Sequence, residues 1–169
     1  MESIHEEEMM PLNDLQMKRL GVDVVEYNDL KNWHIKLPVI VLFLTESKTS
    51  GHWFCLLKHK GKVLEVFDSY GTLPDGWFHW ISKKQQQNLG QEIHYLTSLL
   101  ERYKNKGYTI IYNTKQFQKS KMQDCGRHVL ARLLNKHLTL DQYNEKILKS
   151  GLRSDDYVTE ITDKYIFNK

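Results

Sequence analysis

Three apolar runs that lie close together in the sequence constrain the fold more than any other feature. Residues 38–45 form a continuous apolar and β-branched run, which is typical of a strand buried on both faces. Residues 52–58 and 62–68 are two further strand-like segments, and the polar Lys58-His59-Lys60-Gly61 between them indicates a hairpin turn. We therefore expect these three strands to lie in one sheet.

Helical patterns precede and follow the expected strands. Apolar residues recur at helical spacing in the later segments, and Thr139 with Gln142 forms a capping box at the start of one of them. The order of elements predicts an α+β fold, a small mixed sheet with helices packed around it. The other expected elements are helices over 13–20, 28–33, 93–103 and 125–134, helices that begin after Thr139 and at Ser154, and a strand over 108–113.

The length and composition fit one globular domain. The chain has 169 residues, of which 40% are hydrophobic and 27% charged, enough to build a proper core. We expect a flexible tail over 1–10 and a single domain over 11–169. The acidic N-terminus does not resemble a signal peptide and the longest apolar run is only strand-sized. We therefore expect a monomeric protein made in the cytosol, neither secreted nor associated with a membrane.

Three residues at the ends of expected elements suggest nucleophilic catalysis by a thiol. His52 opens one strand of the hairpin and Asp68 closes the other, so their side chains can meet. A carboxylate in that position holds an imidazole in one tautomer. Cys125 opens a helix, where exposed N–H groups and the helix dipole favour a thiolate.

Each of these residues also has a structural interpretation. The chain contains eight histidines, most of which must be structural. An aspartate at a strand end usually begins a turn, and a cysteine before a helix is often a packed small residue. Cys55 fits that last description, because it lies in mid-strand and should be buried. With only two cysteines, both are expected to be free thiols.

The sequence GHWFCLLKHKGKVLEVFDSYG, followed by QKSKMQDCG, resembles the clan of cysteine proteases that includes the adenovirus maturation protease and the SUMO-specific proteases. His52-Trp53, the segment Phe67-Asp68-Ser69-Tyr70-Gly71, and Asp124-Cys125-Gly126 each match a motif of that clan. The chain order of histidine, acid, glutamine and cysteine also matches. The resemblance covers residues 11–134 and implies the adenain and ubiquitin-like-protease fold, with the nucleophile at the start of a central helix.

The resemblance also implies a glutamine upstream of the nucleophile. Gln118 lies seven residues before Cys125, a spacing similar to that of the adenovirus-type enzymes. Gln116 and Gln123 compete for this role, but Gln123 is too near Cys125 in the chain to reach back. We expect the Gln118 amide and the Cys125 N–H to donate to the oxyanion of the reaction.

The function implied by the resemblance is that of a cysteine endopeptidase without a cofactor, which cuts protein substrates after glycine-type motifs. Trp53, Asp124 and Gly126 are the expected substrate-binding residues, and Trp53 would wall a narrow channel. The short chain favours a viral or virophage enzyme that matures capsid precursors in the virion and host cytoplasm. The alternative is a cytoplasmic or nuclear isopeptidase that removes SUMO-like or ubiquitin-like modifiers.

Two other interpretations concern nucleic acid and metal. The net charge of +3 permits nucleic-acid contact without requiring it. Cys125 with His128 would supply half of a metal site, and since no second pair is evident we predict no metal. The residues considered for a weak nucleic-acid groove are Lys83, Lys84, Lys104, Lys106, Lys115, Lys119, Lys121, Trp77 and Trp80.

Overall fold

The computed structural model describes residues 20–47, 50–119 and 125–167. In this part of the chain five strands form one sheet, and their spatial order is the same as their order in the sequence. The outer pairs β1–β2 and β4–β5 are parallel and the inner pairs are antiparallel, so the sheet is mixed. The strands are β1 (Asp23–Glu26), β2 (Val39–Ser47), β3 (Ser50–His59), β4 (Val63–Phe67) and β5 (Thr109–Tyr112).

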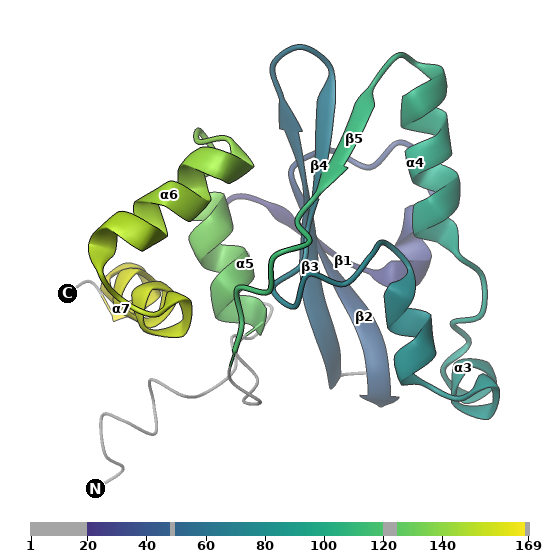
Figure 1. Ribbon diagram of the computed structural model, residues 1–169. Helices are drawn as coiled ribbons and strands as arrows, with labels where there is room; N and C mark the ends of the chain where they lie inside the picture. Colours follow the sequence, from purple (N-terminus) through teal and green to yellow (C-terminus); the bar gives the residue numbers. More distant parts are fainter. Residues whose placement is uncertain (1–19, 48–49, 120–124, 168–169) are drawn as a thin grey trace, which may run out of the picture.

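Helices cover both faces of this sheet (Figure 1). One face is covered by α5, with α6 and α7 packed outside it, and the other by α4 and two short 3-10 helices. None of the helices in the described ranges has the length and apolar character needed to cross a membrane. The helices are η1 (Tyr27–Lys31), η2 (Gly76–Trp80), α3 (Lys83–Leu89), α4 (Tyr95–Asn105), α5 (Cys125–Leu134), α6 (Leu140–Ser150) and α7 (Ser154–Phe167).

Alternation along the central strands divides the core into two layers. Ile40 and Leu42 of β2 pack with Cys55 of β3 in the layer beneath α5, α6 and α7. Val41 of β2 and Phe54 of β3 pack in the opposite layer, beneath α4 and the 3-10 helices. Successive strand residues point to opposite faces, and both faces are covered, which explains why residues 39–44 are buried without interruption.

A buried ion pair fixes α5 against β4. The Arg132 guanidinium donates from Nε and Nη2 to the two carboxylate oxygens of Glu65, at 2.9 and 2.8 Å, and both residues are fully buried. Remaining donors of Arg132 reach the carbonyl oxygens of Asn135 and Leu138. Because two nitrogens of Arg132 bind both carboxylate oxygens of Glu65, the pair fixes the position of α5 along β4.

The structure confirms the α+β class and most of the expected elements. Strands over 38–45, 52–58, 62–68 and 108–113 correspond to β2, β3, β4 and β5, and the last three helices are also present. The capping box of Thr139 and Gln142 begins α6 as expected.

Three details of the sequence-based prediction are corrected. The short strand β1 was not expected, and the helix over 28–33 is a single 3-10 segment, η1. Ile93 lies before the start of α4 and is exposed, so it does not belong to the apolar face of that helix. The expected tail over 1–10 lies outside the described residues, as does nearly all of the helix expected over 13–20.

Candidate functional site

The hairpin of β3 and β4 brings His52 and Asp68 together. Cys55 of β3 is paired with Phe67, the last residue of β4, so Asp68 lies just beyond the paired region. The Nε2 atom of His52 contacts Oδ1 of Asp68, and both side chains are buried. β3 begins at Ser50. His52 was expected to open this strand but is its third residue.

The Asp68 carboxylate is held by a tight turn that follows β4. Its Oδ2 accepts a hydrogen bond from the Thr72 main-chain N–H at 2.8 Å, while the Gly71 N–H donates to the Asp68 carbonyl at 3.0 Å. Gly71 has a φ of +71°, and a Cβ there would lie 2.7 Å from the Thr114 carbonyl oxygen. Position 71 of the Phe-Asp-Ser-Tyr-Gly segment therefore requires glycine, because φ is positive and there is no room for a Cβ.

Cys125 is the first residue of α5 and lies beside the same histidine. The Trp53 main-chain N–H donates to its Sγ at 3.5 Å, and the cysteine is close enough to the His52 ring to raise the pKa of the imidazole. Because Nε2 of His52 is engaged by Asp68, Nδ1 is the ring nitrogen left for sulfur. The structure thus aligns carboxylate, imidazole and thiol in that order.

The environment of His52 favours its protonated form. Burial alone would lower its pKa, but the hydrogen bonds with Asp68 and Cys125 and the coulombic attraction of both groups outweigh it. The result is a pKa raised from 6.5 to about 9. A histidine with a raised pKa, placed between a carboxylate and a cysteine, is an arrangement suited to nucleophilic catalysis by a thiol.

Aromatic rings enclose the imidazole. The rings of Tyr70 and Trp80 lie with centroids 5.6 and 5.1 Å from that of His52, and Trp77 lies at 6.2 Å. Trp80 is 45% exposed, whereas Trp77 is fully buried. The ring orientation of His52 is therefore constrained by packing as well as by Asp68.

Gln118 is buried close to the same residues. Its Oε1 accepts from the Ser69 hydroxyl at 2.7 Å, and its Nε2 donates to the Tyr70 hydroxyl at 3.1 Å. Tyr70 in turn packs against the His52 ring. Gln116 is exposed and its amide donates to the main-chain carbonyl of Gln118, so it supports the Gln118 segment. Gln123 lies outside the described residues.

The expected substrate-binding residues are only partly described. Gly126 is buried directly after Cys125, and Trp53 packs in the same apolar cluster as the thiol, with 8% of its surface exposed. Asp124 lies outside the described residues. The role of Trp53 as a channel wall therefore stays a prediction.

The two cysteines are in different environments. Both are free, but Cys55 is completely buried beneath α5, as expected for a core residue. Burial, followed by the nearby charge of Glu65, raises the pKa of the Cys55 thiol well above its usual range. Reaction with a polar electrophile at neutral pH is thus disfavoured at Cys55.

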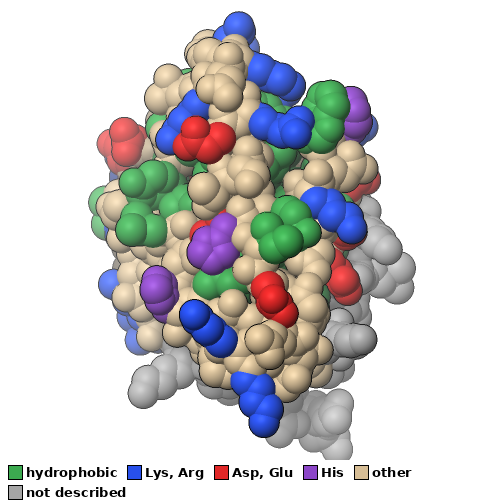
Figure 2. Space-filling view, turned by 90° about the vertical axis from the view of Figure 1, so that its right-hand side faces the viewer, with side chains coloured by type: hydrophobic (Ala, Val, Ile, Leu, Met, Phe, Trp, Pro, Cys, Tyr) green, Lys and Arg blue, Asp and Glu red, His purple; other side chains and the backbone are tan. Residues whose placement is uncertain are grey.

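Of the two tryptophans considered for the nucleic-acid groove, the structure excludes Trp77, whereas Trp80 is exposed. Trp77 is buried and stacked on Phe54 with ring centroids 4.3 Å apart, so it cannot stack on a base. Lys106 lies over the ring of Trp33, and Lys115 donates to Asn144. On the side of the molecule that carries α3 and α4, basic side chains are scattered among acidic, apolar and histidine side chains (Figure 2).

The half metal site is also not assembled. His128 points from α5 to α7, where its Nε2 contacts Oδ1 of Asp155 at 2.9 Å. Among the described residues no group of three or more His, Cys, Asp or Glu side chains is placed to hold a metal ion.

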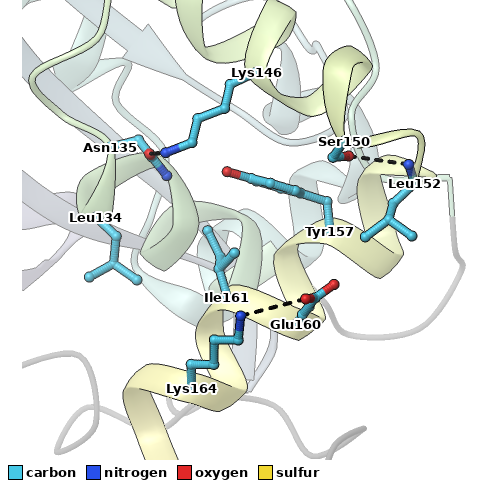
Figure 3. Close-up of a pocket in the computed structure, with 9 residues that line it drawn as sticks. All are labelled: Leu134, Asn135, Lys146, Ser150, Leu152, Tyr157, Glu160, Ile161 and Lys164. Carbon is cyan, nitrogen blue, oxygen red and sulfur yellow. Dashed lines mark hydrogen bonds and ion pairs between the residues drawn. The ribbon is translucent and has the colours of Figure 1, made fainter. Parts of the chain in front are cut away.

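A pocket of about 470 Å³ opens between α5, α6 and α7 (Figure 3). Tyr157 extends its hydroxyl into this pocket, and Lys146 reaches across one side to Asn135. Its described lining contains none of the site residues expected from the sequence, and it lies beyond the C-terminal end of the helix that Cys125 begins. The pocket is therefore separate from the candidate site.

Several residues of the site were not identified from the sequence. Asn113, Thr72 and Asp155 all form hydrogen bonds to the candidate site or to the segment that carries Gln118. Of these supporting residues, Asn113 alone had a local signal in the sequence, because it is a polar residue at the end of an apolar strand. The others depend on contacts between distant parts of the chain.

Comparison with known proteins finds a relative in a virophage. No protein-family model matches the sequence. The chain is similar to a virophage protein. It is 36% identical over 109 residues to the uncharacterized protein V9 of Sputnik virophage, an alignment that covers 63% of this chain. The chain spans about three fifths of the length of that relative, since the match covers 61% of it.

Proposed function

We propose that this protein is a cysteine endopeptidase in which Cys125 is the nucleophile, His52 the general acid and base, and Asp68 the residue that orients His52. The observation that supports this most strongly is the order of three buried groups, Asp68 to His52 to Cys125, gathered from β3, the turn after β4 and the start of α5. An arrangement of nucleophile, base and orienting group is the diagnostic geometry of nucleophilic catalysis by a thiol.

In the proposed reaction the Cys125 thiolate attacks the carbonyl carbon of the scissile peptide bond. The His52 imidazolium gives its proton to the leaving nitrogen as the carbon–nitrogen bond breaks, which leaves a thioester on sulfur. Water then attacks the thioester while His52 takes its proton, and the carbon–sulfur bond breaks to release the acid product and restore the Cys125 thiolate and the His52 imidazolium. Asp68 stays ionised throughout and stabilises the imidazolium.

The oxyanion formed in each step needs hydrogen-bond donors. We assign this role to the Gln118 amide together with the Cys125 main-chain N–H. Gln118 is buried, and its amide lies against Tyr70, which packs on the His52 ring. Loss of one oxyanion donor typically lowers kcat by about 100- to 1000-fold.

For the fold, we propose the adenain and ubiquitin-like-protease arrangement. The antiparallel hairpin that carries histidine and acid, with a cysteine at the start of a helix packed on the same sheet, is compatible with it. For the substrate, we propose viral precursor or capsid proteins cut after glycine-type motifs. The similarity to a virophage protein supports a viral setting without indicating an activity.

A peptidase assay with site variants tests the function. Peptides with glycine before the scissile bond should be hydrolysed by the wild type, and neither Cys125→Ala nor His52→Ala should show measurable cleavage. Cys55→Ala is the matched control, because its thiol is fully buried in the core and has no role in the proposed reaction, and it should retain kcat provided that it folds. Cleavage by Cys125→Ala equal to that of the wild type would refute the proposed function.

A further inference from the structure

The segment that carries Gln118 is attached to the start of α7. The Ser154 hydroxyl donates to the carbonyl oxygen of Phe117, and Oδ2 of Asp155 accepts from the Lys119 main-chain N–H at 3.1 Å. These bonds lie on either side of Gln118 in the chain. The Gln118 segment is therefore held from two sides, by the Ser69 carbonyl, which accepts from the Phe117 and Gln118 N–H groups at 2.8 Å, and by the first turn of α7.

Asp155 also binds the helix that begins with Cys125. Its Oδ1 contacts Nε2 of His128 at 2.9 Å, and His128 is fully buried, three residues after Cys125 on α5. One carboxylate thus connects two parts of the candidate site. One oxygen bonds to the Gln118 segment and the other to α5, one helical turn beyond the thiol.

The chemistry of this bridge makes it a firm connection. Hydrogen bonds to an ionised carboxylate are shorter and stronger than neutral ones, and a carboxylate in the first turn of a helix is favoured by the helix dipole. Ser154 and Asp155 both lie in the first turn of α7, whose later residues Tyr157 and Val158 are packed in the core beneath the sheet. The bridge is thus anchored on a rigid element.

We propose that Asp155 is a positioning residue that sets the Gln118 amide relative to Cys125, so that the amide and the Cys125 N–H can bind one oxyanion. This inference rests on the proposed peptidase function. Asp155 acts through Lys119 and His128 and does not itself meet the substrate. In this proposal α7 contributes to the reaction in addition to His52, Asp68 and Cys125.

Two reactions of the same thiol separate this role from a general structural one. Alkylation by iodoacetamide needs a thiolate but no oxyanion donor, because no tetrahedral oxyanion forms. Peptide hydrolysis needs both. A residue that positions Gln118 should therefore affect kcat for hydrolysis and leave the alkylation rate of Cys125 almost unchanged, whereas a residue that only supports the fold should affect both.

The test compares Asp155→Ala with Asp156→Ala. Asp156 is the next residue in the same turn, but it is exposed and pairs with Arg153 at 2.9 Å. We expect Asp155→Ala to lower kcat by about tenfold or more with little change in KM, while the alkylation rate of Cys125 stays within about twofold of the wild type. Asp156→Ala should match the wild type in both measurements.

Asp155→Asn keeps the test decisive if the alanine variant does not fold, as judged by circular dichroism. It retains the shape of the side chain but offers only a neutral acceptor, so a smaller loss of kcat with unchanged alkylation is expected. Wild-type kcat in a folded Asp155→Ala or Asp155→Asn, or equal losses of hydrolysis and alkylation, would overturn the positioning role. Absence of hydrolysis by the wild type would instead refute the proposed function.

Discussion

The side-chain amide of Asn113 holds the main chain of Asp68 at the point where pairing between β4 and β5 ends. Its Oδ1 accepts from the Asp68 N–H at 3.0 Å and its Nδ2 donates to the Asp68 carbonyl at 2.5 Å. The last paired residues are Val66 and Tyr112, so Asn113 continues the ladder with its side chain. It thereby fixes the residue that orients His52.

Replacement of this amide should destabilise the protein and slow its reaction. Asn113→Ala leaves a buried Asp68 N–H without its partner, which typically costs about 1–3 kcal/mol in the free energy of unfolding. Urea denaturation measures this cost, and the exposed Asn88→Ala serves as control. If Asn113→Ala unfolded at the same urea concentration as the wild type, the amide would have no such role.

The raised pKa of His52 predicts how stability depends on pH. The folded ring keeps its proton up to about pH 9, whereas the unfolded ring loses it near pH 6.5. The stabilisation from His52 is therefore fully present below pH 6.5 and is lost as the pH rises to about 9.

Unfolding free energies measured across this pH range test that dependence. Relative to His52→Gln, the wild type should lose on the order of 3 kcal/mol between the two limits. The exposed His137→Gln should follow the wild-type curve. A difference between wild type and His52→Gln that did not change with pH would show that His52 has no elevated pKa.

Asp68→Asn should leave the fold intact and lower turnover by several orders of magnitude. The amide cannot stabilise the His52 imidazolium, and it favours the wrong tautomer of the ring. The peptide-hydrolysis rate should therefore fall about 10⁴-fold while the circular dichroism spectrum is retained. A loss of less than about tenfold would contradict the orienting role of Asp68.

The buried ion pair between Glu65 and Arg132 predicts a strongly non-additive double mutant. Arg132→Met leaves the fully buried Glu65 carboxylate without its main partner, which should cost about 3–5 kcal/mol. Glu65→Leu combined with Arg132→Met removes both charges and should recover much of that loss. The exposed pair of Lys149 and Glu145 is the control, and Lys149→Ala should change the melting temperature little.

Additive effects of the single replacements at Glu65 and Arg132 would contradict this account of the pair. Chemical denaturation of the four proteins in the cycle gives the coupling free energy directly.

The sequence was sufficient for those features that depend on local pattern. The apolar runs and turn of the β2, β3 and β4 segment predicted three strands, and strand order then placed His52 near Asp68. β1 was missed because a four-residue strand with partly exposed side chains has no clear periodicity. The 3-10 form of η1 was missed for a similar reason, since a single short turn has little pattern.

The remaining parts of the site depend on distant contacts. Asn113 reaches Asp68 across 45 positions of the chain, and Asp155 reaches Lys119 across 36. The spacing of residues along the sequence does not predict such contacts. Trp77 was misassigned to a surface groove. A turn-rich sequence around a tryptophan does not indicate whether its side chain is buried or exposed.

The most direct test is the intact mass of the protein after incubation with a peptide that ends in glycine and carries a thiol-reactive electrophile. One adduct per chain is predicted, located at Cys125 by peptide mapping, absent from Cys125→Ala and strongly slowed in His52→Ala. An unmodified wild-type protein, or labelling of Cys55 at a rate equal to that of Cys125, would contradict an activated thiol at the start of α5.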